Sequence, residues 1–393
     1  MQTNSKNQMF VVIFSVILAF LVIFGLKEVK NRLTKGSDTK DTETTTVLSQ
    51  TKPVAEPTTK QETTKPIIIT NNPKDKREKS TLIFAGNMNV TETLFINSMK
   101  DEIITKESKD FFRSGDLSFL NLRTGFSAMT DRTTDSNTGN FAEIAYEDIF
   151  INMGITGVAL ANNHIMDYGN GTITSTTSLL KRKDIVYAGA GNNFTDASTP
   201  LIKNIGGRKI GIVNVSKIIP DDNWIATNKS DENNSRPGIH YYDNNDDIKS
   251  AVESCKLQCD IVIAYINCGD EDLEKTDASQ QLVAHDVIDA GANLVIECNT
   301  NKILPIEYYN GVPIFYSLGT MLSEAEPDTA LALIVSVDEK DALSFRLKAF
   351  TSGNSSLTAL DETKASKIFN ELNKASKDTF ATITEDGAVL KIQ

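Results

Sequence analysis

Short apolar runs alternate with amphipathic stretches over residues 81–393. Seven runs rich in Val, Ile, Leu and Phe have the composition of buried strands, and they span 81–86, 117–122, 157–161, 209–215, 260–266, 293–297 and 312–318. Apolar residues at helical spacing predict helices at 141–153, 172–183, 244–256 and 278–290. Strands that alternate with helices predict an α/β domain. Near the end of the chain, runs at 330–338 and 342–350 predict an antiparallel pair, followed by a helix at 363–376.

The first eighty residues follow a different pattern. Residues 9–26 are uncharged and apolar, and as a helix they would reach about 27 Å, close to the hydrocarbon thickness of a bilayer. We interpret them as a transmembrane anchor after a short tail, residues 1–8. A cleaved signal peptide and a buried core helix are the alternatives, but no small-x-small cleavage site follows. Residues 27–80, rich in Thr, Lys and Pro, lack an apolar period and predict a disordered stalk.

Two features of this segment bear on its orientation. Basic residues follow the apolar run at Lys27, Lys30, Arg32 and Lys35, whereas only Lys6 precedes it. The positive-inside rule alone would therefore place the large domain in the cytoplasm. A stalk rich in Thr and Pro between an anchor and a globular domain is instead typical of surface proteins. We expect a single-pass protein of the cell membrane with an extracytoplasmic C-terminal domain.

Composition narrows the function further. The 393 residues are 40% hydrophobic and carry a net charge of -12. Residues 1–80 hold 13 basic and 8 acidic residues, so the remainder has 27 basic against 44 acidic residues, a net charge of -17. Such an acidic domain argues against nucleic-acid binding. The basic stalk is either a solvated spacer or a segment that lies against an anionic lipid or cell-wall polymer. Three histidines are too few for a histidine-rich metal centre.

Polar residues cluster where the predicted strands end. In an α/β fold, chemistry is concentrated at these positions. The candidate pocket residues are Asn87, Arg123, Asn162, Asn163, His164, Asn267, Glu271, Glu297, Cys298, Asn299 and Asn301.

Four motifs in the same order along the chain resemble the bacterial CapA family. They are LANNHIMDYG (160–169), GAGNNFTDASTPLI (189–202), DAGANLVIE (289–297) and PIEYYNGVPIFYSLGT (305–320). Members of this family are capsule and poly-γ-glutamate synthesis proteins. The resemblance implies a metallo-dependent phosphatase-like layered α/β sandwich for 81–393 and supports the extracytoplasmic orientation.

The ligand positions of that family are mostly changed in this chain. The family pattern has an Asp, a Glu, an Asn-Asn-His, a His before Trp-Gly and a final His cluster. The chain keeps Asn162, Asn163 and His164, with Asp167 and Glu271 nearby. The other positions are occupied by Asn87, Arg123, Asn267, Cys298, Asn299 and Asn301.

These changes argue against a metal centre. Two dications about 3.5 Å apart repel by roughly 19 kcal/mol at an effective dielectric of about 20, which anionic ligands must offset. Arg123 reverses the charge at the bridging Glu position. We therefore expect no cofactor and no pair of divalent metals such as manganese or zinc, and the chain is interpreted as a degenerate pseudoenzyme.

Two charged residues have two interpretations each. Arg123 either takes the place of the metal charge and binds a carboxylate or phosphate, or forms a salt bridge to a local acid such as Asp116 or Asp167. His164 is either a metal ligand or acid–base group, or a structural residue of the Asn-Asn-His turn.

The four cysteines also leave alternatives open. Cys268 and Cys298 follow strands that should be neighbours, so they are candidates for a disulfide, or for a single zinc together with His164. Cys255 and Cys259 are four residues apart, on one helix face or at a helix end. Buried free thiols are the third interpretation for the cysteines.

Three functions remain. The first is a membrane-anchored, non-catalytic protein of capsule or poly-γ-glutamate synthesis or export. Its partners would be the membrane, membrane polymer-synthase subunits and an anionic cell-envelope polymer, by analogy with the family. The second is a hydrolase or transferase with a rewired site, acting on a phosphoester or γ-glutamyl bond. The third is a small-anion binding protein that uses Arg123.

Overall fold

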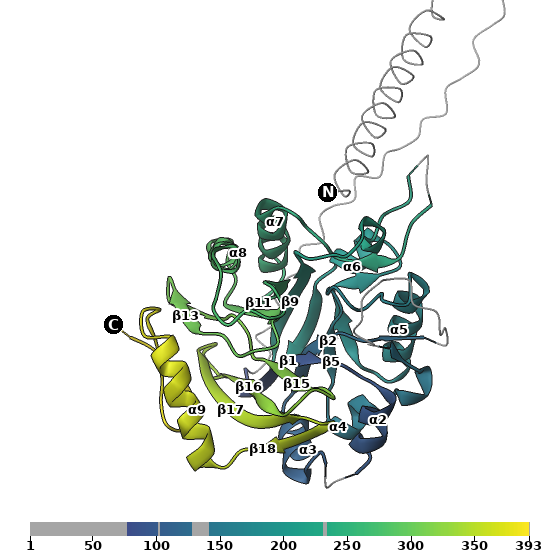
Figure 1. Cartoon of the computed structure of the whole chain (residues 1–393). Helices are drawn as coiled ribbons and strands as arrows, with labels where there is room; N and C mark the ends of the chain where they lie inside the picture. Colours follow the sequence, from purple (N-terminus) through teal and green to yellow (C-terminus); the bar gives the residue numbers. More distant parts are fainter. Residues whose placement is uncertain (1–76, 101–102, 128–140, 231–233, 393) are drawn as a thin grey trace, which may run out of the picture. The chain divides into compact units, whose positions relative to one another are not determined.

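The computed structural model describes residues 77–100, 103–127, 141–230 and 234–392. These residues form a mixed α/β domain, as the alternating pattern predicted (Figure 1). The predicted tail and anchor, 1–26, lie outside the described residues, as does the predicted stalk up to residue 76. Within the described ranges, no helix is both long and apolar enough to cross a membrane.

The larger sheet has the strand order β19-β20-β17-β16-β1-β2-β5-β6, with β15 also paired to β1 and β18 to β17. Strands β1, β2, β5 and β6 are parallel. Strand β16 is antiparallel to both β1 and β17, which confirms the predicted antiparallel pair. The strands are β1 Ser80–Met88, β2 Leu117–Leu122, β5 Gly157–Ala159, β6 Val186–Ala188, β15 Thr320–Leu322, β16 Asp328–Val337, β17 Leu343–Gly353, β18 Ser356–Ala359, β19 Ala381–Ile383 and β20 Ala388–Lys391.

The second sheet has the order β13-β14-β12-β11-β9-β8. Its four inner strands are parallel, and the two edge strands are antiparallel to their neighbours. Its strands are β8 Leu201–Ile205, β9 Arg208–Ser216, β11 Ile261–Cys268, β12 Leu294–Asn299, β13 Ile306–Tyr309 and β14 Val312–Phe315. Two short pairs complete the strands, β3 Gly125–Phe126 with β4 Phe141–Ala142, and β7 Ala190–Gly191 with β10 Gly238–Ile239.

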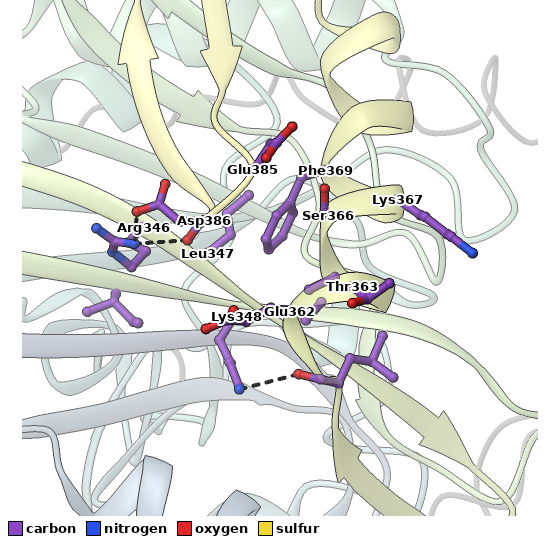
Figure 2. Close-up of a pocket in the computed structure, with 14 residues that line it drawn as sticks. Arg346, Leu347, Lys348, Glu362, Thr363, Ser366, Lys367, Phe369, Glu385 and Asp386 are labelled. Atoms are coloured by element: carbon purple, nitrogen blue, oxygen red, sulfur yellow. Dashed lines mark hydrogen bonds and ion pairs between the residues drawn. The ribbon is translucent and has the colours of Figure 1, made fainter.

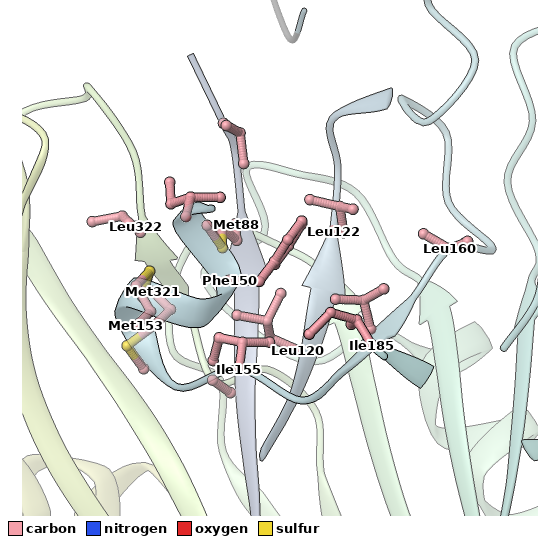
Figure 3. Packing of buried hydrophobic residues seen from close by; sticks show 14 of the residues in the cluster. Met88, Leu120, Leu122, Phe150, Met153, Ile155, Leu160, Ile185, Met321 and Leu322 are labelled. Atoms are coloured by element: carbon pink, nitrogen blue, oxygen red, sulfur yellow. The ribbon is translucent and has the colours of Figure 1, made fainter. Parts of the chain in front are cut away.

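Apolar residues form three clusters that define the layers. One cluster lies between the two sheets and includes Phe84 and Tyr265. A second joins the larger sheet to the helices around it and includes Phe150 (Figure 3). The third packs α7 and α8 against the second sheet (Figure 1). The helices are α2 Glu92–Ser98, α3 Lys106–Arg113, α4 Ile149–Met153, α5 Gly171–Arg182, α6 Phe194–Ser198, α7 Asn245–Lys256, α8 Ala278–Asp289 and α9 Glu362–Ala375, with 3-10 turns η1 Ile144–Tyr146 and η2 Asp222–Trp224.

Most of the predicted helices begin at a capping side chain. The Asn244 side chain accepts from the backbone N–H of Asp247 at the start of α7, and Asp277 forms a capping box with Gln280 at the start of α8. Each capping side chain accepts a hydrogen bond from a backbone N–H in the first turn, which has no partner within the helix. This explains why these helices start where the pattern predicted.

The single helix predicted over 141–153 is wrong. Residues 141–142 form β4, which pairs with β3, and only Ile149–Met153 is α-helical. The carbonyl of Ala142 accepts from the backbone N–H of Ser127. Pairing with a segment distant along the chain therefore uses the backbone groups that a helix would need, which local periodicity cannot reveal.

Candidate functional site

The ends of the parallel strands in both sheets converge on one polar region. The side chain of Asn87 at the end of β1 reaches the second sheet, where its Nδ2 donates to the backbone carbonyls of Asn299 and Thr300 at 3.1 Å each. Most candidate residues meet here because parallel strands place their carboxyl ends at the same edge. The region contains Asn87, Arg123, Asn162, Asn163, His164, Asn267, Glu271, Cys298, Asn299 and Asn301.

A chain of buried amides forms the floor of this region. Asn162 Nδ2 donates to Asn121 Oδ1 at 3.1 Å, and Asn121 Nδ2 donates to Asn87 Oδ1 at 2.9 Å. The Asn162 Oδ1 atom accepts from the backbone N–H groups of His164 and Ile165 and so fixes the turn after β5. These amide groups already form hydrogen bonds within the chain, so their role is to stabilise the site and not to bind a ligand.

Asn121 was not among the candidate residues, although a signal for it exists. It is the one amide in the apolar strand segment LSFLNL and is fully buried. A buried Asn in a central strand needs polar partners. Such a residue therefore indicates a polar network at that end of the strand.

Four ionisable side chains contact one another in succession next to these amides, and we call them the charged row: Arg123, Glu271, His164 and Asp167. Arg123 forms an ion pair with Glu271, with a 2.6 Å distance between Nη2 and Oε1. The same Glu271 oxygen is 2.7 Å from His164 Nε2, and His164 Nδ1 is 3.2 Å from Asp167 Oδ2. Arg123 also donates to Asn301 Oδ1 at 3.1 Å.

The salt-bridge interpretation of Arg123 is confirmed, but its partner is Glu271. Of the two local acids considered, Asp116 accepts instead from the backbone N–H of Thr81, and Asp167 contacts His164. Glu271 follows β11, 148 positions along the chain from Arg123. Only the packing of one sheet on the other brings the two together.

The contacts in this row shift the pKa values of Glu271 and His164 in opposite directions. Burial by itself would raise the pKa of Glu271, but the His164 hydrogen bond and the Arg123 charge lower it to about 2. Burial would likewise lower the pKa of His164, yet its hydrogen bonds to Asp167 and Glu271 raise it above the usual value. Each partner thus favours the charged form of the other.

This donor set does not fit the pair of metal ions that the family pattern implies. The guanidinium of Arg123 contacts Glu271, so a positive charge already lies beside the carboxylate that a dication would need. Both ring nitrogens of His164 contact carboxylate oxygens, so these contacts would have to break before the ring could bind a metal. No group of three or more His, Cys, Asp or Glu side chains within the described ranges is arranged to hold a metal ion.

The register between β11 and β12 shows to which face of the second sheet the remaining candidate residues project. Cys298 lies opposite Asn267 in the β11–β12 pair, so Cys268 and Cys298 project from opposite faces of the sheet. Both thiols are free and buried, which agrees with the third interpretation of the cysteines. The register contradicts the two alternatives, a disulfide between Cys268 and Cys298 and a zinc shared by them. Glu297 projects to the same face as Cys268 and is fully buried on the side of α8, away from the charged row.

Two clefts open on the charged row, and both are lined by Glu271. One, of about 350 Å³, includes Arg123 and Ser352 in its lining, and the other, of about 540 Å³, includes Asn163 and Lys217. A larger cavity, of about 770 Å³, lies elsewhere, beside β17 and α9 (Figure 2). In its lining, Arg346 is paired with Asp386 and Lys348 donates to the Leu360 carbonyl, and none of the candidate residues lines it.

The fold and the site together define a class of protein: a layered α/β domain whose polar residues gather at the carboxyl ends of its parallel strands. Residues 81–325 match the family model described as "Bacterial capsule synthesis protein PGA_cap". The match covers more than half of the chain, and the chain belongs to this family. This finding confirms the resemblance to CapA proteins.

Curated relatives carry related names. A "PGA biosynthesis protein CapA" from Bacillus subtilis is 29% identical over 252 residues, which are 60% of this chain and 61% of that protein. A "Capsule biosynthesis protein CapA" from Bacillus anthracis is 26% identical over 169 residues, 43% of this chain and 40% of that protein. A Mycobacterium tuberculosis protein named as a polyglutamine synthesis accessory protein is 29% identical over 177 residues, 43% of this chain and 45% of that protein. The chain thus spans about half the length of these relatives.

Among solved structures, one from Staphylococcus aureus, provisionally named a 5′-nucleotidase, aligns with a TM-score of 0.42 and 14% identity. It covers 78% of this chain and 57% of that one. The layers of this domain are defined by its own two sheets and not by that alignment.

Proposed function

We propose that this chain is a membrane-anchored, extracytoplasmic accessory protein of capsule or poly-γ-glutamate synthesis or export, and that it does not act as a metallophosphatase. Family membership and the names of the relatives support a role in the synthesis of capsule or poly-γ-glutamate. The apolar run 9–26 and the stalk support the anchor and its orientation. The single observation that carries the non-catalytic part is the ion pair between Arg123, which occupies a ligand position of the family pattern, and the nearby Glu271.

The same proposal defines what the chain contacts. An accessory protein without its own chemistry works by positioning other components, so its partners are membrane polymer-synthase subunits and the growing anionic polymer. The acidic domain repels a polyanion over long range. Contact with the polymer is therefore confined to local basic groups or to the basic stalk.

A complementation experiment in the encoding bacterium tests this role. We expect full-length chain to restore cell-associated polymer to a deletion strain, and His164→Gln to restore it equally, because His164 performs no chemistry. A chain without residues 9–26 should restore little. His285→Gln is the matched control, since His285 lies outside the site, paired with Glu307. Loss of polymer with His164→Gln alone, at equal abundance in the membrane, would instead support a hydrolase or transferase with a rewired site.

Metal content gives a second, independent measurement. Full-length chain in detergent would be incubated with manganese and zinc, freed of excess metal, and analysed by elemental mass spectrometry. We expect close to zero metal per chain, because Arg123 contacts Glu271 and both ring nitrogens of His164 already contact carboxylates. Two equivalents per chain would contradict the proposal and revive a metal-dependent hydrolase acting on a phosphoester or γ-glutamyl bond.

One observation favours a second function, the binding of a small anion. Arg123 and Ser352 line the 350 Å³ cleft, and the buried Nε and Oγ atoms of these residues have no hydrogen-bond partner within the described part of the chain. Two unsatisfied donors suit a carboxylate or phosphate oxygen. The flanking Lys302 is paired with Asp328 and adds little net charge.

Calorimetric titration with glutamate and with inorganic phosphate tests this second function. We expect Ser352→Ala to weaken binding about tenfold, which corresponds to the loss of one hydrogen bond to a charged group. Ser356→Ala is the control, because the Ser356 hydroxyl donates to the Gly353 carbonyl and does not line the cleft. No binding by the unmodified chain, or equal weakening by both variants, would dismiss the anion site.

A further inference from the structure

Two cysteines far from the charged row lie against each other at the end of α7. Cys255 is in the last turn of the helix, and Cys259 follows the helix end, just before β11. Their Sγ atoms are 3.8 Å apart. Cys255 is fully buried, whereas Cys259 is half-buried and so within reach of a reagent from solvent.

The strand beneath this pair has a residue that makes room for both sulfur atoms. A Cβ atom on Gly211 of β9 would lie 2.4 Å from Cys255 Sγ and 2.7 Å from Cys259 Sγ. Any other residue here would therefore displace the sulfurs. A glycine inside a strand costs stability, and it commonly marks a close approach of other groups to the backbone. At Gly211, the groups that approach are the two thiols.

We propose that Cys255 and Cys259 are a site of oxidative modification, at which a disulfide oxidant joins them in an intramolecular disulfide. The Cys259 thiolate attacks the oxidant, forms a mixed disulfide and releases one thiol. The Cys255 thiolate then attacks the Cys259 sulfur and releases the second thiol. The chain loses two protons and two electrons, and the oxidant is reduced to two thiols.

The geometry requires only a local change. The two sulfurs must approach from 3.8 Å to about 2.05 Å. Rotation of the Cys259 side chain, which lies beyond the last turn of α7, provides this movement. The bond would tie the end of α7 to the start of β11, the strand that leads to Glu271.

The chemistry of the thiols sets the expected rate. Burial, together with the neighbouring Cys259, raises the pKa of Cys255 to about 12, and burial also raises the pKa of Cys259. Few thiolates are present at neutral pH, so the bond forms slowly. A thiol of high pKa is also a poor leaving group, so the bond is reduced slowly. An extracytoplasmic compartment is where such a bond persists, although the site itself does not depend on the proposed function.

Peptide mapping of the full chain tests this inference. Reduced protein in detergent, freed of reductant, would be incubated with oxidised glutathione, alkylated under denaturing conditions and digested with trypsin. Lys256 lies between the two cysteines, so cleavage places them on separate peptides, 250–256 and 257–275. We expect these peptides to be joined through Cys255 and Cys259, with Cys268 and Cys298 alkylated.

Two serine variants make the assignment specific. Cys259→Ser should abolish the joined peptides, whereas Cys298→Ser should leave them unchanged. Fragmentation distinguishes Cys259 from Cys268, which share the peptide 257–275. The inference is overturned if Cys255 and Cys259 are both alkylated after oxidation, if Cys259 carries only glutathione, or if the link involves Cys268.

Discussion

Replacement of Arg123 by alanine is expected to lower the free energy of unfolding by about 3 kcal/mol at neutral pH. Arg123 is 2% exposed, and its removal leaves the Glu271 carboxylate without its guanidinium partner. The cost arises from a partly buried charge that has lost compensation and from the emptied volume. Urea unfolding of the full chain, followed by the fluorescence of its single tryptophan, the buried Trp224, measures the change.

Two comparisons separate this effect from general damage. Arg346→Ala removes an exposed pair with Asp386 and should cost less than about 1 kcal/mol. In a Glu271→Ala background, Arg123→Ala should cost less than in the original chain, because the two residues are coupled. Equal costs in both backgrounds would show that the ion pair is not the source of the stability.

The second large effect concerns the buried carboxyl of Glu297 and is a dependence of stability on pH. Burial raises the pKa of Glu297 well above 4.5, and neither carboxyl oxygen has a hydrogen-bond partner in the described ranges. The neighbouring Gln280 side chain lowers the pKa somewhat, but its Nε2 atom does not lie in hydrogen-bond geometry to either carboxyl oxygen. We therefore expect Glu297 to keep its proton to a higher pH in the folded chain than in the unfolded chain.

The sign of the pH effect follows from linkage. Because the folded pKa is raised, the stabilising contribution of the proton is complete below about pH 4.5 and is lost as the pH rises towards the folded pKa. The loss amounts to at most about 1.4 kcal/mol per pH unit. We expect Glu297→Gln to remove this loss of stability. Between pH 5 and pH 8, the range chosen for the experiment, the urea midpoint of the variant should therefore fall less than that of the original chain.

A matched control for this prediction is Glu253→Gln on α7. Glu253 is exposed, so its substitution should leave the pH dependence unchanged. If the original chain and Glu297→Gln had the same dependence on pH, Glu297 would be ionised in the folded state, and a partner for it would have to be sought.

Much of the architecture followed from local pattern. The predicted strand at 117–122 coincides with β2, and the helices predicted at 244–256 and 278–290 coincide with α7 and α8 within a residue at either end. These elements have strong periodicity and clear capping residues, so local preference and tertiary packing agree. The segment 141–153 failed because pairing of β4 with β3 overrode its local pattern.

The candidate site was predictable as a set of residues but not as a set of contacts. Strand ends identified Asn87, Arg123 and His164, because parallel strands gather their ends in space. The partner of Arg123 could not be read in the same way, since Glu271 lies in the loop after β11, a strand of the other sheet. The partners decide the chemistry, because Glu271 pairs with Nη2 of Arg123, whereas Nε is left without a partner in the described ranges.

The sequence by itself determined the α/β class, the family, the apolar run at the N-terminus and the loss of anionic ligand positions, because each depends on residue type and spacing along the chain. Only the tertiary structure decided that Cys268 and Cys298 project to opposite faces and that Cys255 and Cys259 meet over Gly211. Side chains alternate across a sheet with a period of two, so the register between distant strands sets every such contact. That register is fixed by the packing of the whole domain and leaves no local signature in the sequence.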